Sequence, residues 1–127
     1  MPAQLNHTIV AAHDAHASAT FLAEVLGLPA PTTFGHFQVV EAANGVSLDF
    51  MDSGDSFETQ HYAFLVGEDE FDEIFGRIRA RRLTYWADPG RRHAGEINTH
   101  FGGRGVYFPD PDDHLLEIIT RPYGSEP

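Results

Sequence analysis

The sequence passes through the same series of expected elements twice, and this repetition limits the fold more than any other feature. Each half reads as a strand, an amphipathic helix and further strands, and His7 overlays His61 at the start of the two first strands. At 127 residues, the chain has the length of one domain. We therefore expect a single α+β domain, residues 1–127, made of two βαβββ modules at about residues 4–52 and 60–121.

Local signals place the elements of the first module. Asp14 has the residue type of a helix N-cap, and it precedes a helix predicted over Ala15–Leu26. Gly27 follows at the position where a glycine commonly ends a helix. Farther along, the pair Asn44-Gly45 between two apolar segments predicts a β-hairpin.

The second module is predicted with a longer connection. Asp69 is the expected N-cap of its helix, which should end at about Arg82. Residues 83–87 are expected to form a short strand, and residues 88–104 a long loop. Two final strands should then flank a turn that is rich in proline and aspartate.

The composition excludes several classes of function. A net charge of −11 argues against nucleic-acid binding, because the phosphate backbone would repel such a surface. The absence of cysteine excludes disulfides, thiolate metal ligands and a cysteine nucleophile. No signal peptide and no apolar run of ~18 residues is visible, so we expect a cytoplasmic protein that does not bind membranes.

A carboxylate in an apolar strand points to chemistry. Glu117 lies within the apolar run of residues 115–119, where a buried, unpaired carboxylate would be costly and therefore needs a partner. Overlaying the last strands of the two halves places Asp49 on Glu117, as His7 lies on His61. Two histidines and one carboxylate suit Fe(II), Mn(II), Zn(II) or Ni(II) and leave coordination positions open. Ordinary half-buried histidines are the alternative.

Three segments of the sequence resemble the vicinal-oxygen-chelate superfamily of glyoxalases, extradiol dioxygenases, and bleomycin- and fosfomycin-resistance proteins. The segments are LNHTIVAAHDAHASATFLAEVLGLP, HYAFLV and GVYFPDPDDHLLEII. The resemblance implies that the two modules form a curved, cup-like mixed sheet with its helices on the outside. It also implies that His7, His61 and Glu117 are the ligands of one divalent metal ion.

The end of the sequence resembles the signature of extradiol ring-cleaving dioxygenases. His100, Tyr107 and Glu117 stand at the spacing of that signature, whereas Asp113 replaces its usual glycine or proline. The resemblance implies that His100 and Tyr107 are catalytic, because a histidine can relay protons and a phenol can stabilise a developing oxyanion. An exposed loop histidine and a packed strand tyrosine are the alternatives.

Other polar residues are weaker candidates. The resemblance implies that Asp49 would be a fourth metal ligand if the site were of the glyoxalase type, whereas a surface-facing strand aspartate is the simpler reading. Arg91, Arg92 and Arg104 lie in or beside the long loop, where substrate-binding groups concentrate. They are predicted to bind an anionic group of the substrate, and the alternative is a solvated basic patch.

The sequence therefore predicts a metal-dependent lyase or dioxygenase for a small substrate that chelates the metal through two vicinal oxygens, with extradiol ring cleavage as one version. A glyoxalase-like isomerase or a thiol transferase would use the same ligands. A metal-free, drug-sequestering protein of the bleomycin-resistance kind is the alternative from another class, and the intact ligand set disfavours it. We expect a homodimer, because open sheet edges invite pairing and small members of this superfamily commonly pair.

Overall fold

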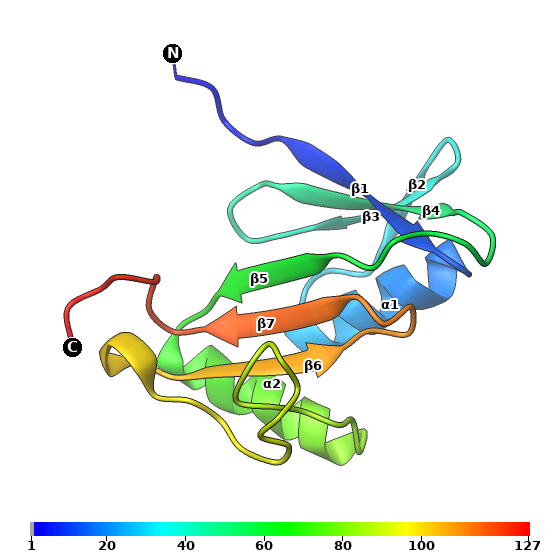
Figure 1. Ribbon diagram of the computed structural model, residues 1–127. Coiled ribbons are helices and arrows are strands. Elements are labelled where there is room, and N and C mark those ends of the chain that lie inside the picture. The colour runs from blue at the N-terminus through cyan, green and yellow to red at the C-terminus, as the bar shows by residue number, and fades with distance from the viewer. Residues whose placement is uncertain (1) are drawn as a thin grey trace. The chain divides into compact units, whose positions relative to one another are not determined.

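The computed structural model describes residues 2–127, which form two compact units, one ending at Glu58 and the other beginning at Thr59. The elements are β1 (His7–Ala12), α1 (Ala15–Leu26), β2 (Thr32–Phe34), β3 (Phe37–Glu41), β4 (Ser47–Asp52), β5 (His61–Leu65), α2 (Glu68–Ala80), a 3₁₀ turn η1 (His100–Gly102), β6 (Gly105–Pro109) and β7 (Leu115–Ile119) (Figure 1). The predicted α+β class and its two modules are confirmed. Within residues 2–127, no helix has the length and apolar content needed to cross a bilayer.

The first unit is a four-stranded sheet with one helix. Its strands follow the order β1-β4-β3-β2, with β1 parallel to β4 and the other pairs antiparallel. The helix α1 contacts β1, β3 and β4 (Figure 1). Its buried Leu22 and Val25, together with the buried strand residues Val40 and Phe50, form the apolar core of this unit.

The ends of α1 form as the sequence predicts. The Asp14 carboxylate accepts a hydrogen bond from the Ala17 backbone N–H at 3.1 Å. Gly27 adopts φ 71° and ends the helix in the left-handed conformation, which costs glycine little because it lacks a Cβ. Ala15 is also tied to the sheet, because its N–H donates to the Asp52 carboxylate at 2.7 Å.

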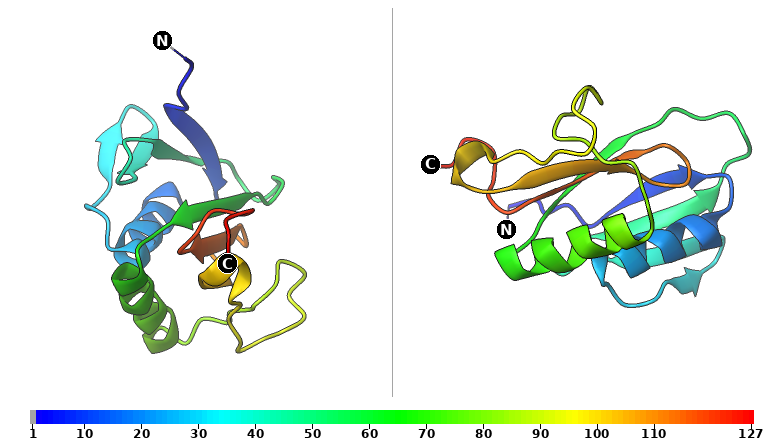
Figure 2. Two further views of the ribbon diagram at one scale, coloured as in Figure 1. Left: turned by 90° about the vertical axis from the view of Figure 1, so that its left-hand side faces the viewer. Right: turned by 90° about the horizontal axis from the view of Figure 1, so that it is seen from below.

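The second unit has a three-stranded sheet in the order β5-β7-β6, with β5 parallel and β6 antiparallel to the central β7. The helix α2 lies along one face of this sheet (Figure 2). Its buried residues Phe71, Ile74 and Ile78 follow helical spacing. On β7, Leu116, Glu117 and Ile118 are all buried, so the central strand is covered on both faces.

Two sequence predictions for the second unit are wrong. The N-cap of α2 is Gly67, not Asp69, because the Glu70 side chain reaches back to accept from the Gly67 N–H at 3.0 Å. The helix ends at Ala80, within two residues of the predicted end at about Arg82. Residues 83–87 form no strand, and Trp86 instead makes isolated bridges to Tyr107 and Ala94.

The strand register shows that the histidine and the carboxylate occupy equivalent positions in the two halves. In the first unit, His7 pairs with Ser47 and Asp49 stands two residues farther along β4. In the second unit, His61 pairs with Leu115 and Glu117 stands two residues farther along β7. Both overlays made from the sequence are thereby confirmed, because each carboxylate has the same offset from its histidine.

Candidate metal centre

Within the second unit, His61 and Glu117 face each other. Because β5 and β7 are parallel neighbours, the histidine at the start of β5 lies beside the carboxylate on β7. His61 Nε2 lies 3.1 Å from Glu117 Oε1, and the His61 side chain is 45% exposed while the Glu117 side chain is 1% exposed. The buried carboxylate thus has a partner that solvent can also reach.

The hydrogen bonds of His61 fit a metal ligand. Its Nδ1 lies 2.9 Å from the Leu115 carbonyl, which can only accept, so Nδ1 carries a proton. In the neutral ring, Nε2 then presents a lone pair toward a carboxylate that also only accepts. A protonated His61 would join these two atoms, 3.1 Å apart, as an ion pair, and with the neutral ring the spacing suits two ligands that each lie ~2.0–2.2 Å from one metal ion.

A tyrosine that the sequence analysis missed completes this cluster. Tyr123 lies in the segment after β7, and its hydroxyl is 2.7 Å from Glu117 Oε1 and 2.6 Å from Glu117 Oε2. The Tyr107 hydroxyl lies 3.0 Å from the Tyr123 hydroxyl. The Tyr107 ring also packs 5.9 Å from the His61 ring, measured between centroids. No spacing rule predicts Tyr123, because it reaches Glu117 only through the fold.

Both phenols remain protonated donors near neutral pH. Burial, followed by the hydrogen bond with Tyr123, raises the pKa of Tyr107. Burial and the hydrogen bond to the Glu117 carboxylate raise the pKa of Tyr123. Tyr107 was predicted as a catalytic group, and its hydroxyl is joined to the Glu117 carboxylate through Tyr123.

The first unit presents its two candidates differently. His7 is exposed, and its Nδ1 lies 2.7 Å from the Asn6 side-chain oxygen. Asp49 is half-buried, and its buried Oδ1 has no hydrogen-bond partner within residues 2–127. A buried carboxylate oxygen without a donor is costly, and it suits a cation as partner. Asp49 therefore remains a candidate ligand.

His100 lies in the 3₁₀ turn η1 and is exposed. Its ring packs 6.3 Å from the Phe101 ring, which in turn lies 5.8 Å from the Tyr123 ring, measured between centroids. Two aromatic contacts thus connect His100 to the tyrosine that binds Glu117. Its predicted catalytic role stays a prediction.

Two of the three predicted substrate arginines, Arg91 and Arg104, have side-chain partners within the second unit. Arg91 donates to Asp113 at 2.9 Å and lies 4.8 Å from the centre of the Trp86 ring. Asp113 has φ 64°, a left-handed conformation that favours glycine, one of the two residue types that the resemblance leads us to expect there. The Arg92 backbone is held by the Asp88 carboxylate at 3.0 Å, and Arg92 is exposed.

Arg104 connects β6 to the start of α2. Its guanidinium donates to Glu68 at 2.8 Å and to Asp72 at 2.7 Å, and it lies 4.3 Å from the centre of the Phe71 ring. These hydrogen bonds raise the pKa of Arg104, the bond to Asp72 contributing most. This arrangement supports the helix, and it accounts for the charge of Arg104 without a substrate.

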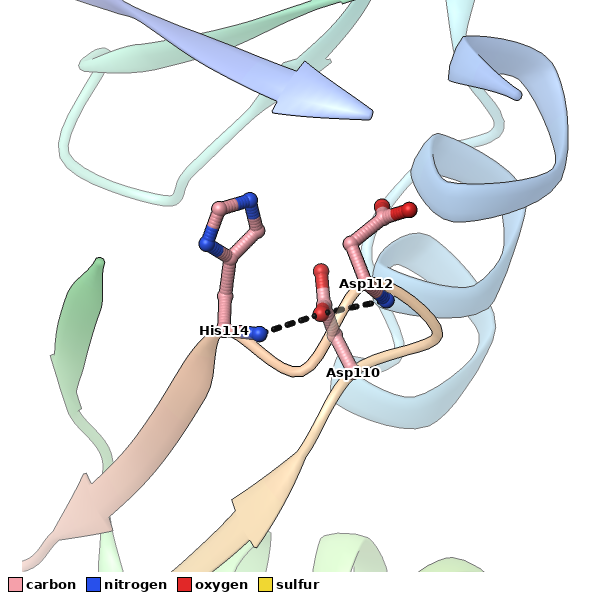
Figure 3. A group of neighbouring side chains, drawn as sticks. All are labelled: Asp110, Asp112 and His114. Carbon is pink, nitrogen blue, oxygen red and sulfur yellow. Dashed lines mark hydrogen bonds between the residues drawn. The ribbon is translucent and has the colours of Figure 1, made fainter. Parts of the chain in front are cut away.

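A second group has the composition of a metal site but the bonding of a turn. Ligand atoms of Asp110, Asp112 and His114 lie within 4.8 Å of one another, and all three residues are buried. Figure 3 shows one Asp110 oxygen between the backbone nitrogens of Asp112 and His114, at 2.9 and 2.8 Å. His114 Nδ1 accepts from the Gln60 N–H at 2.9 Å, so a neutral ring carries its proton on Nε2. The distances permit a metal ion, whereas the hydrogen bonds assign the group to the β6–β7 turn.

Comparison with known proteins places the chain in a family. The model of the Glyoxalase/Bleomycin resistance protein/Dioxygenase superfamily matches residues 4–118. Two solved structures are similar over almost the whole chain. "Oxidase ChaP-H1" is 64% identical, and the match covers 98% of this chain and 100% of that one with a TM-score of 0.95. "Oxidase ChaP-H2" is 63% identical, and the match covers 100% of both chains with a TM-score of 0.97. "Glutathione transferase FosA" of Serratia marcescens is 29% identical over 120 residues, which are 90% of this chain and 78% of that protein. The chain therefore belongs to the Glyoxalase/Bleomycin resistance protein/Dioxygenase superfamily.

Proposed function

We propose that this protein is a divalent-metal-dependent enzyme that oxidises, with O₂, a small substrate whose two neighbouring oxygens would be able to chelate the metal. His61 and Glu117 are two of the proposed ligands, and His7 is the third. The observation that carries the proposal is the pair of lone-pair atoms, His61 Nε2 and Glu117 Oε1, held 3.1 Å apart by the parallel strands β5 and β7.

The proposed ligand set suits this chemistry. Two imidazoles and one carboxylate leave coordination positions free, as non-haem iron oxygenases require. When bound, the metal ion supplies Lewis acidity toward the substrate oxygens and a place for O₂. His7 is included because it is equivalent to His61 in the strand register and because the family resemblance implies it.

Relatives support oxidation over the other reactions of the superfamily. The two structures of 64% and 63% identity are both named oxidases, and each match covers nearly the full length of both chains. The spacing of His100, Tyr107 and Glu117 supports extradiol ring cleavage as one form of this oxidation. His100 would then move protons to and from the substrate, since a histidine titrates near neutral pH.

Thiol transfer is the second candidate, and one observation favours it: the FosA relative, a glutathione transferase, matches 90% of the chain. Its 29% identity is less than half that of the two oxidases. Isomerisation of the glyoxalase kind would require Asp49 as a fourth ligand. A metal-free binding protein is disfavoured, because His61 and Glu117 are present and already face each other.

The test is oxygen consumption by the full chain loaded with Fe(II), using a panel of catechols and isotopically labelled O₂. We expect Fe(II)-dependent oxygen uptake. Two labelled atoms in a ring-cleaved product would support a dioxygenase, whereas an oxidised product without label would support an oxidase. The absence of oxygen uptake, together with metal-dependent loss of glutathione in the presence of an epoxide, would contradict the proposal and support the transferase.

A further inference from the structure

The C-terminal segment donates a hydrogen bond to the proposed carboxylate ligand. Tyr123 lies beyond the end of β7, and its hydroxyl is within 2.7 Å of both Glu117 oxygens, with Oε2 the closer at 2.6 Å. A carboxylate can only accept and a phenol has one proton, so Tyr123 is the donor. The bond is charge-assisted, which makes it stronger than a bond between neutral groups.

A second tyrosine supports the first. Tyr107 on β6 has its hydroxyl 3.0 Å from the Tyr123 hydroxyl. Since the Tyr123 proton points to Glu117, the Tyr107 proton points to the Tyr123 oxygen. The hydrogen bonds of both tyrosines therefore lead to the Glu117 carboxylate, which also contributes, besides burial as the main cause, a hydrogen bond that raises the pKa of Tyr107. Such a chain fixes the phenol of Tyr123 even though 61% of this residue is exposed.

The two oxygens of Glu117 have different surroundings. Oε1 faces His61 Nε2 at 3.1 Å, whereas the shortest contact of Oε2 is with Tyr123 at 2.6 Å. A carboxylate that can rotate freely would present either oxygen, or both, to a cation. The Tyr123 hydroxyl, at 2.7 Å from Oε1 and 2.6 Å from Oε2, restrains the rotation of the carboxylate while Oε1 faces His61 Nε2.

We propose that Tyr123 is a positioning residue that holds the Glu117 carboxylate, so that Oε1 is presented beside His61 Nε2 to a divalent cation. This inference rests on the proposed function, because it requires Glu117 to be a metal ligand. The physical reason is general: a group that hydrogen-bonds a metal ligand sets its orientation, and its loss typically weakens metal binding 10–100-fold.

The position of Tyr123 makes the inference testable. The residue is mostly exposed, and Tyr123→Phe removes one hydroxyl while keeping the ring beside Phe101. Ser125→Ala is a matched control in the same segment, because the Ser125 hydroxyl donates to the Pro122 carbonyl at 2.6 Å rather than to Glu117. Glu117→Gln is the reference for loss of the ligand itself.

The experiment measures Co(II) binding to the metal-free full chain by calorimetry and by the visible absorption of the bound ion. We expect Tyr123→Phe to weaken Co(II) binding ~10-fold and to change the Co(II) spectrum, while Ser125→Ala leaves both unchanged. Tyr107→Phe should have a smaller effect, because Tyr123 keeps its bond to Glu117. The metal-free wild type and the metal-free Tyr123→Phe variant should have the same melting temperature. If the role of Tyr123 were merely structural, its substitution would lower the melting temperature without changing the Co(II) spectrum.

The outcomes separate this inference from the proposed function. If Tyr123→Phe binds Co(II) with wild-type affinity and spectrum while Glu117→Gln does not, the positioning role is overturned and the proposed function stands. If Glu117→Gln also binds as the wild type does, Glu117 is no ligand and both proposals fail. A fall in the melting temperature of metal-free Tyr123→Phe with an unchanged Co(II) spectrum would make the tyrosine structural and overturn the inference.

Discussion

The two units place a histidine and a carboxylate at the same register, yet only the second assembles them into a cluster. His61 Nε2 and Glu117 Oε1 lie 3.1 Å apart, and the Tyr123 hydroxyl donates to the same carboxylate. In the first unit, His7 is bonded to its neighbour Asn6, and Asp49 Oδ1 has no hydrogen-bond partner within residues 2–127. Equivalent backbone positions therefore do not make equivalent sites.

The difference has two local causes. Aspartate is one methylene shorter than glutamate, so Asp49 reaches less far from β4 than Glu117 does from β7. The residue six positions after Glu117 is Tyr123, whereas the residue six positions after Asp49 is Asp55, which is fully exposed and 4.0 Å from His13. A second acid can accept a hydrogen bond but cannot donate one when ionised, so the first unit has no counterpart of the tyrosine.

The largest expected effect is on catalytic turnover. It concerns the long connection between α2 and β6, which carries His100 and has no counterpart in the first unit. If His100 transfers protons, His100→Ala should lower the turnover of the Fe(II)-loaded enzyme ~10²–10⁴-fold with unchanged metal content. The measurements are steady-state oxygen uptake and elemental analysis. His93→Ala, in the same connection, is the control.

Two results would count against this role of His100. Wild-type turnover in His100→Ala would leave the residue as an exposed loop histidine. Loss of metal would make it a ligand, which neither the dioxygenase nor the glyoxalase version of the site includes.

The second prediction compares the two carboxylates directly. Glu117→Gln should weaken Mn(II) binding by at least ~10-fold, because a charged ligand becomes a neutral amide. Asp49→Asn should change it by less than ~3-fold if Asp49 is not a ligand. Equilibrium dialysis with the full chain measures both. Equal losses would erase the contrast between the units and favour a four-ligand, glyoxalase-like site.

The smallest effect concerns the two hairpin turns. The first uses Asn44-Gly45, whereas the second uses the buried Asp110, whose pKa burial raises from 3.8 to about 6. A raised pKa in the folded state means that the fold favours the protonated carboxyl. The stabilisation by this group is therefore complete below about pH 3.8 and is lost as the pH rises through about 6. Relative to the wild type, Asp110→Asn should therefore gain about 1–2 kcal/mol in unfolding free energy between about pH 4 and pH 7.

Urea denaturation at the two pH values measures this change, with Asp113→Asn in the same turn as the control. Asp113 is exposed, so its substitution should change the unfolding free energy less than substitution of the buried Asp110 does. An Asp110→Asn difference that stays constant from acid to neutral pH would show that the turn is insensitive to protonation of this residue.

Features that depend on neighbouring residues were predictable from the sequence. The helix Ala15–Leu26 with its two caps follows from short-range signals, and so does the Asn44-Gly45 hairpin. The cap of α2 was mispredicted because several acidic residues crowd that end, and only the Glu70 side chain shows which backbone N–H is bonded. Trp86 looked like part of a strand, but its bridges go to Tyr107 and Ala94 and extend no ladder.

By itself, the sequence determined the repeated α+β plan and the requirement that Glu117 have a partner, because apolar periodicity and the cost of burying a charge are properties of residue order. Only the tertiary structure decided which groups meet that carboxylate. The parallel pairing of β5 with β7 brings His61 to it, and the path of the chain after β7 brings Tyr123. His61 is far from Glu117 in the sequence, so no local pattern links the two residues. Tyr123 lies beyond the end of β7, where strand periodicity no longer applies and the direction of the side chain depends on the fold.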